Sequence, residues 1–313
     1  MIATSPRSPG SVMGTSLLRR PNLFLIGSMK SGSTYLSALL ATHPAVFVTP
    51  VKEPCYFVDQ RELRRAWPHM WRKGYWRSVE HYLALFAAAG EATVIAEASN
   101  FYSQVPAFGG VPERILSFSP DARFVYIMRD PVERTISHYW HRVRWSGEHR
   151  PLLAALRADP QYTDTSYYAR QLSAYLQHVG RERIYTLTLE GLAEDVVGEM
   201  SRLYAWLGVD ASLRPAARDV DTNMRPDTFE RVRGRGLLDR LRRTPAYWRV
   251  APYVPSPLRT LARSLALRTA STAEAPLAEA RSYLRTRQLD ETEELGRILG
   301  RGFPEWKTLR GCG

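Results

Sequence analysis

Short apolar runs and longer amphipathic stretches alternate along the chain from Leu23 to Trp206, and this alternation limits the fold more than any other feature of the sequence. The apolar runs have the length of buried strands, and the stretches between them carry apolar residues at helical spacing. The predicted strands are Leu23–Ile26, Val46–Val48, Val94–Ala96, Phe124–Met128 and Ile184–Leu189. The pattern predicts an α/β fold, with a doubly wound parallel sheet of about five strands and helices on both of its faces.

The predicted helices occupy the intervals between these strands. They cover Thr34–Leu40, His81–Ala89, Pro112–Ser117, Pro131–Arg144 and Tyr167–His178, and one more runs through Trp206. After Asp210 the pattern changes, because Pro, Arg and short helical pieces dominate to about Arg268, before a last amphipathic segment from Ala275 to Leu299. We expect a loose N-terminal arm at 1–20 and a single domain at 21–313, with a core at 22–210, a basic subregion at 211–270 and C-terminal helices at 271–313.

A loop rich in small residues, Gly27–Thr34, follows the first predicted strand and precedes the first helix. Such a loop turns tightly and aims its N–H groups and the helix N-terminus at one point, which favours an anion. Lys30 adds a positive charge, and Ser31, Ser33 and Thr34 add hydroxyl donors around Gly32. The loop is P-loop-like, but Lys30 precedes Gly32, whereas in nucleotide triphosphatases the lysine follows the second glycine. A different phosphorylated ligand is therefore predicted.

A second anion-binding segment begins where the predicted strand Phe124–Met128 ends. Arg129 stands at the carboxyl end of that strand, Asp130 suits a helix N-cap, and Pro131 suits the first helical position. Ser137 follows about two turns into the helix. Ligands of doubly wound sheets bind outside the carboxyl ends of the strands, so we expect this segment and the Lys30 loop to face one crevice.

Together these segments resemble those of sulfotransferases that use 3′-phosphoadenosine 5′-phosphosulfate (PAPS). Lys30–Thr34 is similar to their 5′-phosphosulfate loop, and Arg129–Ser137 is similar to their 3′-phosphate motif. The resemblance extends through His43-Pro44, Lys52-Glu53-Pro54, Glu97-Ala98-Ser99, Glu190-Gly191-Leu192 and Tyr204–Gly208, with a weaker likeness near Trp306. It covers about residues 22–210 and is closest to the bacterial enzymes and to the Golgi enzymes that sulfate heparan chains.

The resemblance implies a role for each part of the two motifs. Lys30, Ser31, Gly32, Ser33 and Thr34 would bind the 5′ end of PAPS, and Arg129 and Ser137 would bind its 3′-phosphate. Lys30 would also stabilise the charge that grows on the leaving phosphate of adenosine 3′,5′-bisphosphate (PAP) during an in-line displacement. The family uses no metal, and we expect none here. His138 and His141, three residues apart on a predicted helix, are interpreted as surface or packing residues.

A general base must accept the proton of the acceptor on the opposite side of the sulfuryl group. Glu53 matches the catalytic glutamate of the heparan-type enzymes, and a local ion pair with Lys52 is the alternative interpretation. Two departures weaken the prediction of a polysaccharide acceptor. Cys55 stands where those enzymes often have His, and Ala98 stands where many have Lys. The predicted acceptor is therefore a hydroxyl, or less readily an amine, of a carbohydrate, glycolipid or secondary metabolite.

Net charge indicates an anionic partner but does not identify it. The chain carries 43 Lys and Arg against 31 Asp and Glu, and residues 230–268 hold ten arginines against two acidic residues. This segment could close over the nucleotide. Alternatively, Leu258, Leu261 and Leu265 with Arg259 and Arg263 could form an amphipathic helix that contacts anionic lipid. A solvated arginine-rich surface is the third interpretation.

Two rival functions stay open from the sequence: a nucleotide-dependent kinase of P-loop type and a basic nucleic-acid-binding protein. The order of Lys30 and Gly32 argues against the first, and the lack of a recognised binding motif argues against the second. Cys55 and Cys312 predict no disulfide framework, which favours a reducing compartment. No apolar stretch reaches the roughly 20 residues of a membrane-spanning helix. We therefore expect a cytoplasmic enzyme with no specific nucleic-acid partner.

Overall fold

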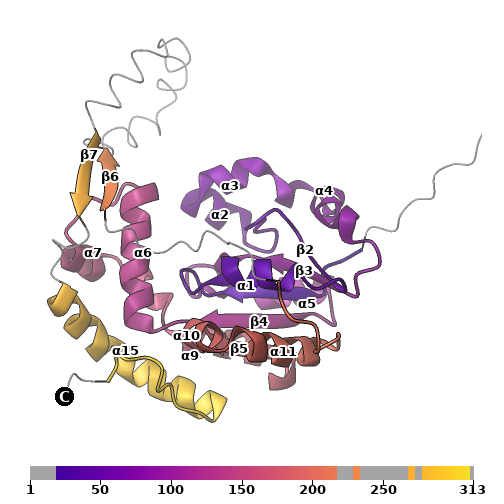
Figure 1. The fold of residues 1–313 in the computed structure, drawn as a ribbon. Coiled ribbons are helices and arrows are strands. Elements are labelled where there is room, and N and C mark those ends of the chain that lie inside the picture. The colour runs from indigo at the N-terminus through magenta and orange to yellow at the C-terminus, as the bar shows by residue number, and fades with distance from the viewer. Residues whose placement is uncertain (1–18, 217–227, 233–266, 272–276, 311–313) are drawn as a thin grey trace, which may run out of the picture.

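The fold is described from a computed structural model, which covers residues 19–216, 228–232, 267–271 and 277–310 (Figure 1). Its centre is a five-stranded parallel sheet in the order β2-β3-β1-β4-β5. The strands are β1 (Leu23–Gly27), β2 (Val46–Val48), β3 (Val94–Ala98), β4 (Arg123–Met128) and β5 (Ile184–Thr188). The prediction of a P-loop-like, doubly wound parallel sheet is confirmed, and all five strands lie where the apolar runs placed them.

Helices follow the strands in the alternation that the sequence predicts. Their bounds are α1 (Ser33–Leu40), α2 (Gln60–Ala66), α3 (Pro68–Lys73), α4 (Val79–Leu83), α5 (Val111–Phe118), α6 (Pro131–Trp145), α7 (Leu152–Ala158), α8 (Gln161–Asp164), α9 (Tyr168–Leu176), α10 (Leu189–Glu194), α11 (Val196–Leu207) and α15 (Leu277–Leu299). The predicted helix His81–Ala89 is α helical only to Leu83 and continues as a 3-10 helix, Ala84–Ala89. In the described residues, no helix is both long and apolar enough to cross a membrane.

The two faces of the sheet carry separate apolar cores, because successive side chains of a strand point to opposite faces. Phe24, Ile26 and Tyr126 belong to one core, which also holds residues of α5 and α9 and the side chain of Trp306. Leu25 and Ile127 belong to the other core, with residues of α1 and α11. Continuous apolar strands therefore form a sheet that is covered on both faces.

The parts of the chain at 211–276 that the structure describes include two strands rather than helices. β6 (Thr228–Val232) pairs in antiparallel register with β7 (Leu267–Ser271), and β6 runs beside α6. Most of the arginine-rich segment, and with it the predicted lipid-binding helix at 258–265, lies outside the described residues. The predicted N-terminal arm also lies outside them up to residue 18. Arg19 and Arg20 are anchored, since their guanidinium groups donate to the carbonyls of Ala92 (2.7 Å) and Phe118 (2.8 Å).

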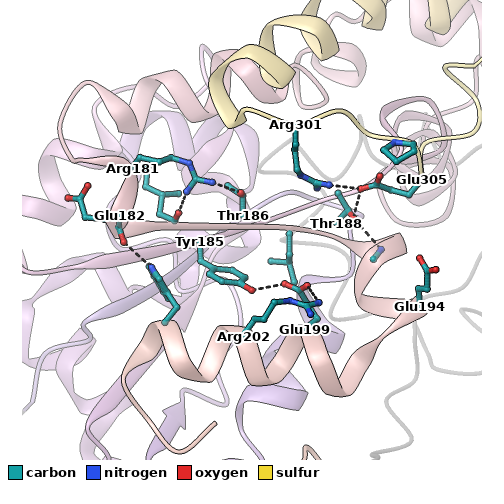
Figure 2. A pocket seen from close by; sticks show the side chains of 15 residues that line it. Arg181, Glu182, Tyr185, Thr186, Thr188, Glu194, Glu199, Arg202, Arg301 and Glu305 are labelled. Carbon is teal, nitrogen blue, oxygen red and sulfur yellow. Dashed lines mark hydrogen bonds and ion pairs between the residues drawn. The ribbon is translucent and has the colours of Figure 1, made fainter.

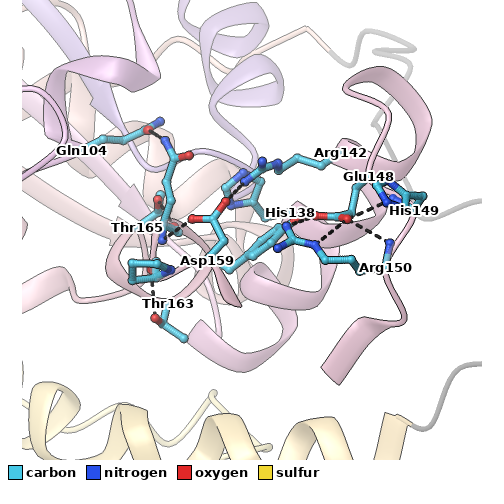
Figure 3. Close-up of polar contacts among 12 residues, drawn as sticks. Gln104, His138, Arg142, Glu148, His149, Arg150, Asp159, Thr163 and Thr165 are labelled. Atoms are coloured by element: carbon cyan, nitrogen blue, oxygen red, sulfur yellow. Dashed lines mark hydrogen bonds and ion pairs between the residues drawn. The ribbon is translucent and has the colours of Figure 1, made fainter. Parts of the chain in front are cut away.

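A cluster of polar contacts fixes the turn between α6 and α7 (Figure 3). Glu148 is buried and accepts hydrogen bonds from the guanidinium of Arg150 (2.6 and 3.0 Å) and the hydroxyl of Tyr162 (2.9 Å). Burial raises the pKa of Glu148, but the bonds from Arg150 and Tyr162 outweigh burial and lower that pKa to about 2. The ionised form of Glu148 therefore stabilises the folded chain at neutral pH.

We expect Glu148→Gln to lower the free energy of unfolding at pH 7 by about 1–3 kcal/mol, because it weakens bonds to a buried charge. A depressed carboxyl pKa stabilises above the ordinary value of 4.5, and this contribution is lost as pH falls towards 2. The difference between the wild type and the variant should therefore shrink over that range in denaturant titrations. Glu293→Gln, at an exposed position of α15, is the matched control. A difference that stays constant from pH 7 to 3 would contradict this assignment.

Candidate active site

Two predicted anion-binding segments meet at the carboxyl edge of the sheet. The Lys30 loop leaves β1 and Arg129 leaves β4, and these two strands are neighbours. The Arg129 guanidinium donates to the carbonyl of Lys30 at 3.5 Å, although the two residues lie 99 positions apart in the chain. This contact joins the two segments at one edge of the sheet.

The loop backbone has a shape that depends on small residues. Gly32 has φ 90° and precedes α1, and a Cβ atom at Gly32 would lie 2.6 Å from Cδ1 of Leu189. The hydroxyls of Ser28 and Ser31 lie 2.6 Å apart within the loop, and both residues are buried. The N-terminus of α1 therefore opens onto a tight turn that carries Lys30.

Positive charge is concentrated around Lys30. Burial lowers the pKa of Lys30, and the charges of Arg129, Arg144, Lys52 and Arg134 lower it further. Lys52, from the segment after β2, donates to the Thr34 hydroxyl at 2.5 Å and so reaches the loop from the other side. Like charges in a partly buried site repel one another, and a bound polyanion would relieve that repulsion.

Arg134, on the first turns of α6, is a cation that sequence reasoning did not assign to the site. Its side chain is fully buried beneath the loop, where Nη1 lies 3.5 Å from the Met29 carbonyl oxygen and Nη2 donates to the Thr135 hydroxyl at 3.2 Å. Its other contacts, to the Ser166 hydroxyl, the Tyr162 carbonyl and Nδ1 of His138, are also with neutral groups, because burial keeps the pKa of His138 well below its ordinary value. Burial lowers the pKa of Arg134 to about 10, so the group is still charged at neutral pH.

The start of α6 is held by a segment from the far end of the chain. Asp130 caps α6 by accepting from the N–H groups of Val132 (3.1 Å) and Glu133 (3.2 Å), and it accepts a further bond from the Thr308 hydroxyl at 2.5 Å. Trp306, fully buried, contacts Tyr168, whose hydroxyl donates to the Arg129 carbonyl at 2.8 Å. The weak likeness near Trp306 was the only feature of the sequence that pointed to this support.

The remaining predicted residues of this region lie on α6. Ser137 is half-buried, and its hydroxyl has no recorded hydrogen bond to another described residue. His138 is buried against Tyr162, at 5.0 Å between ring centroids, as expected of a packing residue. His141 is half-buried, and burial together with the charges of Lys30 and Arg144 lowers its pKa to about 4. Within the described part of the chain, no three His, Cys, Asp or Glu residues are grouped as a metal site.

Glu53 lies beside Lys52, between the Lys30 loop and the end of β3. Its Oε2 accepts the N–H of Asn100 and its Oε1 accepts the Asn100 side-chain amide, both at 2.7 Å. Burial raises the pKa of Glu53 to about 7, although Lys52 and the N–H groups of Asn100 and Phe101 pull it down. A carboxylate with a pKa near neutrality is suited to accepting a proton at physiological pH. Burial is the cause of the raised pKa, so it agrees both with a base and with a local partner of Lys52.

Behind Glu53 lies a second carboxylate, Glu97, which is fully buried. The hydroxyls of Ser99 (2.7 Å) and Tyr82 donate to it, and burial raises its pKa. Cys55 is buried, free, and has a raised pKa because of burial. Glu97 therefore acts as an anchor for hydroxyl groups rather than as a residue open to a ligand.

Three non-glycine residues of the described chain have a positive φ, and all three lie in this region: Lys30 (68°), Glu53 (54°) and Cys55 (55°). This left-handed conformation is costly for residues with a Cβ atom and is found where surrounding contacts impose it, often at functional sites. Two of the three are the residues to which the sequence assigns catalysis.

A groove of about 1030 Å³ lies elsewhere, along the outer edge of β5 (Figure 2). The edge carbonyls of Glu182 and Ile184 accept bonds from Trp206 (2.9 Å) and Arg181. Charged groups that line the groove also pair with each other, as Arg202 does with Glu199 at 2.7 Å. None of the predicted site residues lines this groove, so it is separate from the candidate active site.

Comparison with known proteins points to one family. A model of the sulfotransferase family matches residues 21–212. The chain is 32% identical over 129 residues to the membrane-associated sulfotransferase kil1 of Dictyostelium discoideum, covering 41% of this chain and 24% of that protein. It is 27% identical over 215 residues to the heparan sulfate glucosamine 3-O-sulfotransferase 6 of Mus musculus, covering 65% of this chain and 57% of that protein. The matches thus span less than two thirds of each relative's length.

A solved structure shares the fold. A sulfotransferase from Alicyclobacillus acidocaldarius superposes with a TM-score of 0.66 at 23% identity, and the match covers 92% of this chain and 99% of that one. At this level of identity the likeness concerns the fold and not the substrate.

Proposed function

Since this chain belongs to the sulfotransferase family, we propose that it transfers a sulfuryl group from PAPS to a hydroxyl, or less readily an amine, of a carbohydrate, glycolipid or secondary metabolite. The family match does not favour the alternatives of a kinase or a nucleic-acid-binding protein. The donor, the acceptor class and the roles of the residues below belong to the proposal, as do a cytoplasmic location and contact with anionic lipid.

The observation that supports the donor is the cluster of cations where the β1 and β4 segments meet. Lys30, Lys52 and Arg129 surround the N-terminus of α1, and Arg134 is buried beneath. Among the described residues, no carboxylate forms an ion pair within 4.0 Å of Lys30, Arg129 or Arg134. A nucleotide with a 3′-phosphate and a 5′-phosphosulfate supplies negative charge at two separated points and fits such a cluster.

Each end of the donor has its own group of residues in this proposal. Arg129 and the Ser137 hydroxyl bind the 3′-phosphate, since a guanidinium offers a planar pair of donors to phosphate. The loop residues Ser31, Gly32, Ser33 and Thr34 hold the 5′ end at the start of α1. Lys30 lies in the same loop and faces the phosphosulfate.

Transfer then needs one bond to form and one to break. The acceptor oxygen forms a bond to sulfur as the bond between sulfur and the 5′-phosphate oxygen breaks, and PAP leaves. Glu53 accepts the acceptor proton, and Lys30 stabilises the negative charge that develops on the leaving phosphate. The proposal uses no metal, because the two charge changes are met by Glu53 and Lys30.

Arg129→Ala should weaken PAP binding by about 10- to 100-fold in isothermal titration calorimetry, because a charge-assisted bond to phosphate contributes roughly 1.5–3 kcal/mol. Arg157→Ala, which removes an exposed arginine of α7, should bind PAP as the wild type does. Equal affinity of Arg129→Ala and the wild type would remove Arg129 from the 3′-phosphate site.

A further inference from the structure

One residue holds both oxygens of the Glu53 carboxylate. The backbone N–H of Asn100 donates to Oε2 and its side-chain Nδ2 donates to Oε1, each at 2.7 Å. Asn100 is the first residue of a short 3-10 helix, η3 (Asn100–Ser103). Only Ser99 separates this helix from the end of β3. The N–H of Phe101 also bonds to this carboxylate. Because the two oxygens together offer about four lone-pair sites, the carboxylate can still accept from another partner. The two bonds fix the plane of the carboxylate and leave it able to accept a proton.

The residues before Asn100 hold the backbone of the same turn. The N–H of Glu53 donates to the Ala98 carbonyl at 3.0 Å, and the N–H of Cys55 lies 3.4 Å from the Ser99 hydroxyl oxygen. The two residues that these bonds hold, Glu53 and Cys55, both have a positive φ. Ala98 and Ser99 therefore hold the backbone of the turn at 53–55, and Asn100 holds the carboxylate of Glu53.

We propose that Asn100 is the positioning residue for Glu53, orienting its carboxylate towards the acceptor and favouring its ionised form. This inference rests on the proposed function of Glu53 as the base. In this proposal Asn100 does not contact the reacting atoms, and it acts only through Oε1 and Oε2 of Glu53. Its own carbonyl accepts from the Gln104 side-chain amide at 3.3 Å, which ties Asn100 to the end of η3.

The charged and titratable groups near Glu53 give the direction of the expected effect. Lys52 lowers the pKa of Glu53, Glu97 raises it, and Cys55 is neutral because burial raises its own pKa. Donors to an ionised carboxylate lower its pKa, so removal of the Asn100 amide should raise the pKa of Glu53.

The test is a titration of Glu53 itself, by NMR of protein labelled with ¹³C at the glutamate carboxyl carbons and with Glu53→Gln to assign the resonance. Asn100→Ala keeps the backbone N–H and loses the amide, and it should move the midpoint upward by about one pH unit. Asn100→Asp, which has the same shape but adds a negative charge, should move it further. Asn100→Ser keeps a short donor and should move it less. Gln161→Ala removes a half-buried amide that does not contact Glu53, and it should leave the midpoint unchanged.

The outcomes separate this inference from the proposed function. The role of Asn100 is supported if the midpoint of the Glu53 titration rises least in Asn100→Ser, more in Asn100→Ala and most in Asn100→Asp. PAP affinity in calorimetry should stay unchanged in all three variants. A midpoint equal to that of the wild type in both Asn100→Ala and Asn100→Asp overturns it. A wild type that transfers no sulfuryl group from PAPS to any acceptor contradicts the proposed function instead, because the titration does not depend on transfer.

Discussion

Replacing Lys30 with alanine is expected to lower the rate of sulfuryl transfer by about 100- to 1000-fold, the usual effect of removing one preorganised donor to developing negative charge. Lys30 lies in the loop between β1 and α1, partly buried, with a pKa lowered by burial and by Arg129. Its charge is therefore poorly screened by water. A partly buried charge of this kind should stabilise the leaving phosphate more strongly than an exposed lysine would.

Single-turnover assays with labelled PAPS measure this effect directly, because they separate the chemical step from product release. PAP affinity should fall less than the rate, since the charge on the leaving oxygen grows only in the transition state. Lys73→Ala, at an exposed position that ends α3, is the matched control. If Lys30→Ala turned over as the wild type does, Lys30 would have no part in the mechanism.

Glu53→Gln should reduce transfer by about 100- to 10,000-fold while PAP affinity stays close to that of the wild type. The substitution keeps the size of the side chain and removes the group that accepts the proton. Because the pKa of Glu53 is about 7, the wild-type rate should fall as pH drops below 7 and Glu53 becomes protonated. The residual rate of Glu53→Gln should lack this dependence.

The measurement is kcat/KM between pH 5 and 9 for the wild type, Glu53→Gln and the exposed control Glu113→Gln. A variant that lost PAP binding together with transfer would make Glu53 structural. A wild-type profile with no fall on the acid side would contradict its role as the base.

The fold could be predicted from the sequence because its strands are unbroken apolar runs separated by amphipathic stretches. Leu23–Gly27 and Arg123–Met128 are buried on both faces, so their composition alone sets them apart. α2 and α3 were missed because the stretch from Gln60 to Lys73 is rich in arginine and has few buried residues, Leu63 and Met70 among them. These helices depend on their ends: the Asp59 side chain caps α2, and Pro68 starts α3.

The site could be predicted from the sequence only where its residues lie in local motifs. Lys30 lies in the loop that follows β1, and Arg129 directly follows β4, so sequence spacing places both at the same edge of the sheet. Asn100, Arg134 and Thr308 escaped notice because their partners lie 47, 105 and 178 positions away in the chain. Nothing in the local sequence of Asn100 indicates that it holds a carboxylate, and only the paired strands bring it to Glu53.

The central claim is that the site at Lys30 and Arg129 uses PAPS to sulfate an acceptor. The most direct measurement incubates the wild-type protein with ³⁵S-labelled PAPS and a pooled set of glycans, glycolipids and hydroxylated metabolites, with a chelator present and no nucleoside triphosphate. We predict that label moves to an acceptor whose mass rises by one SO₃ unit, and that Lys30→Ala and Glu53→Gln move it at least about 100-fold more slowly. Label that stays in PAPS with every acceptor, together with no PAP binding in calorimetry, would contradict the account.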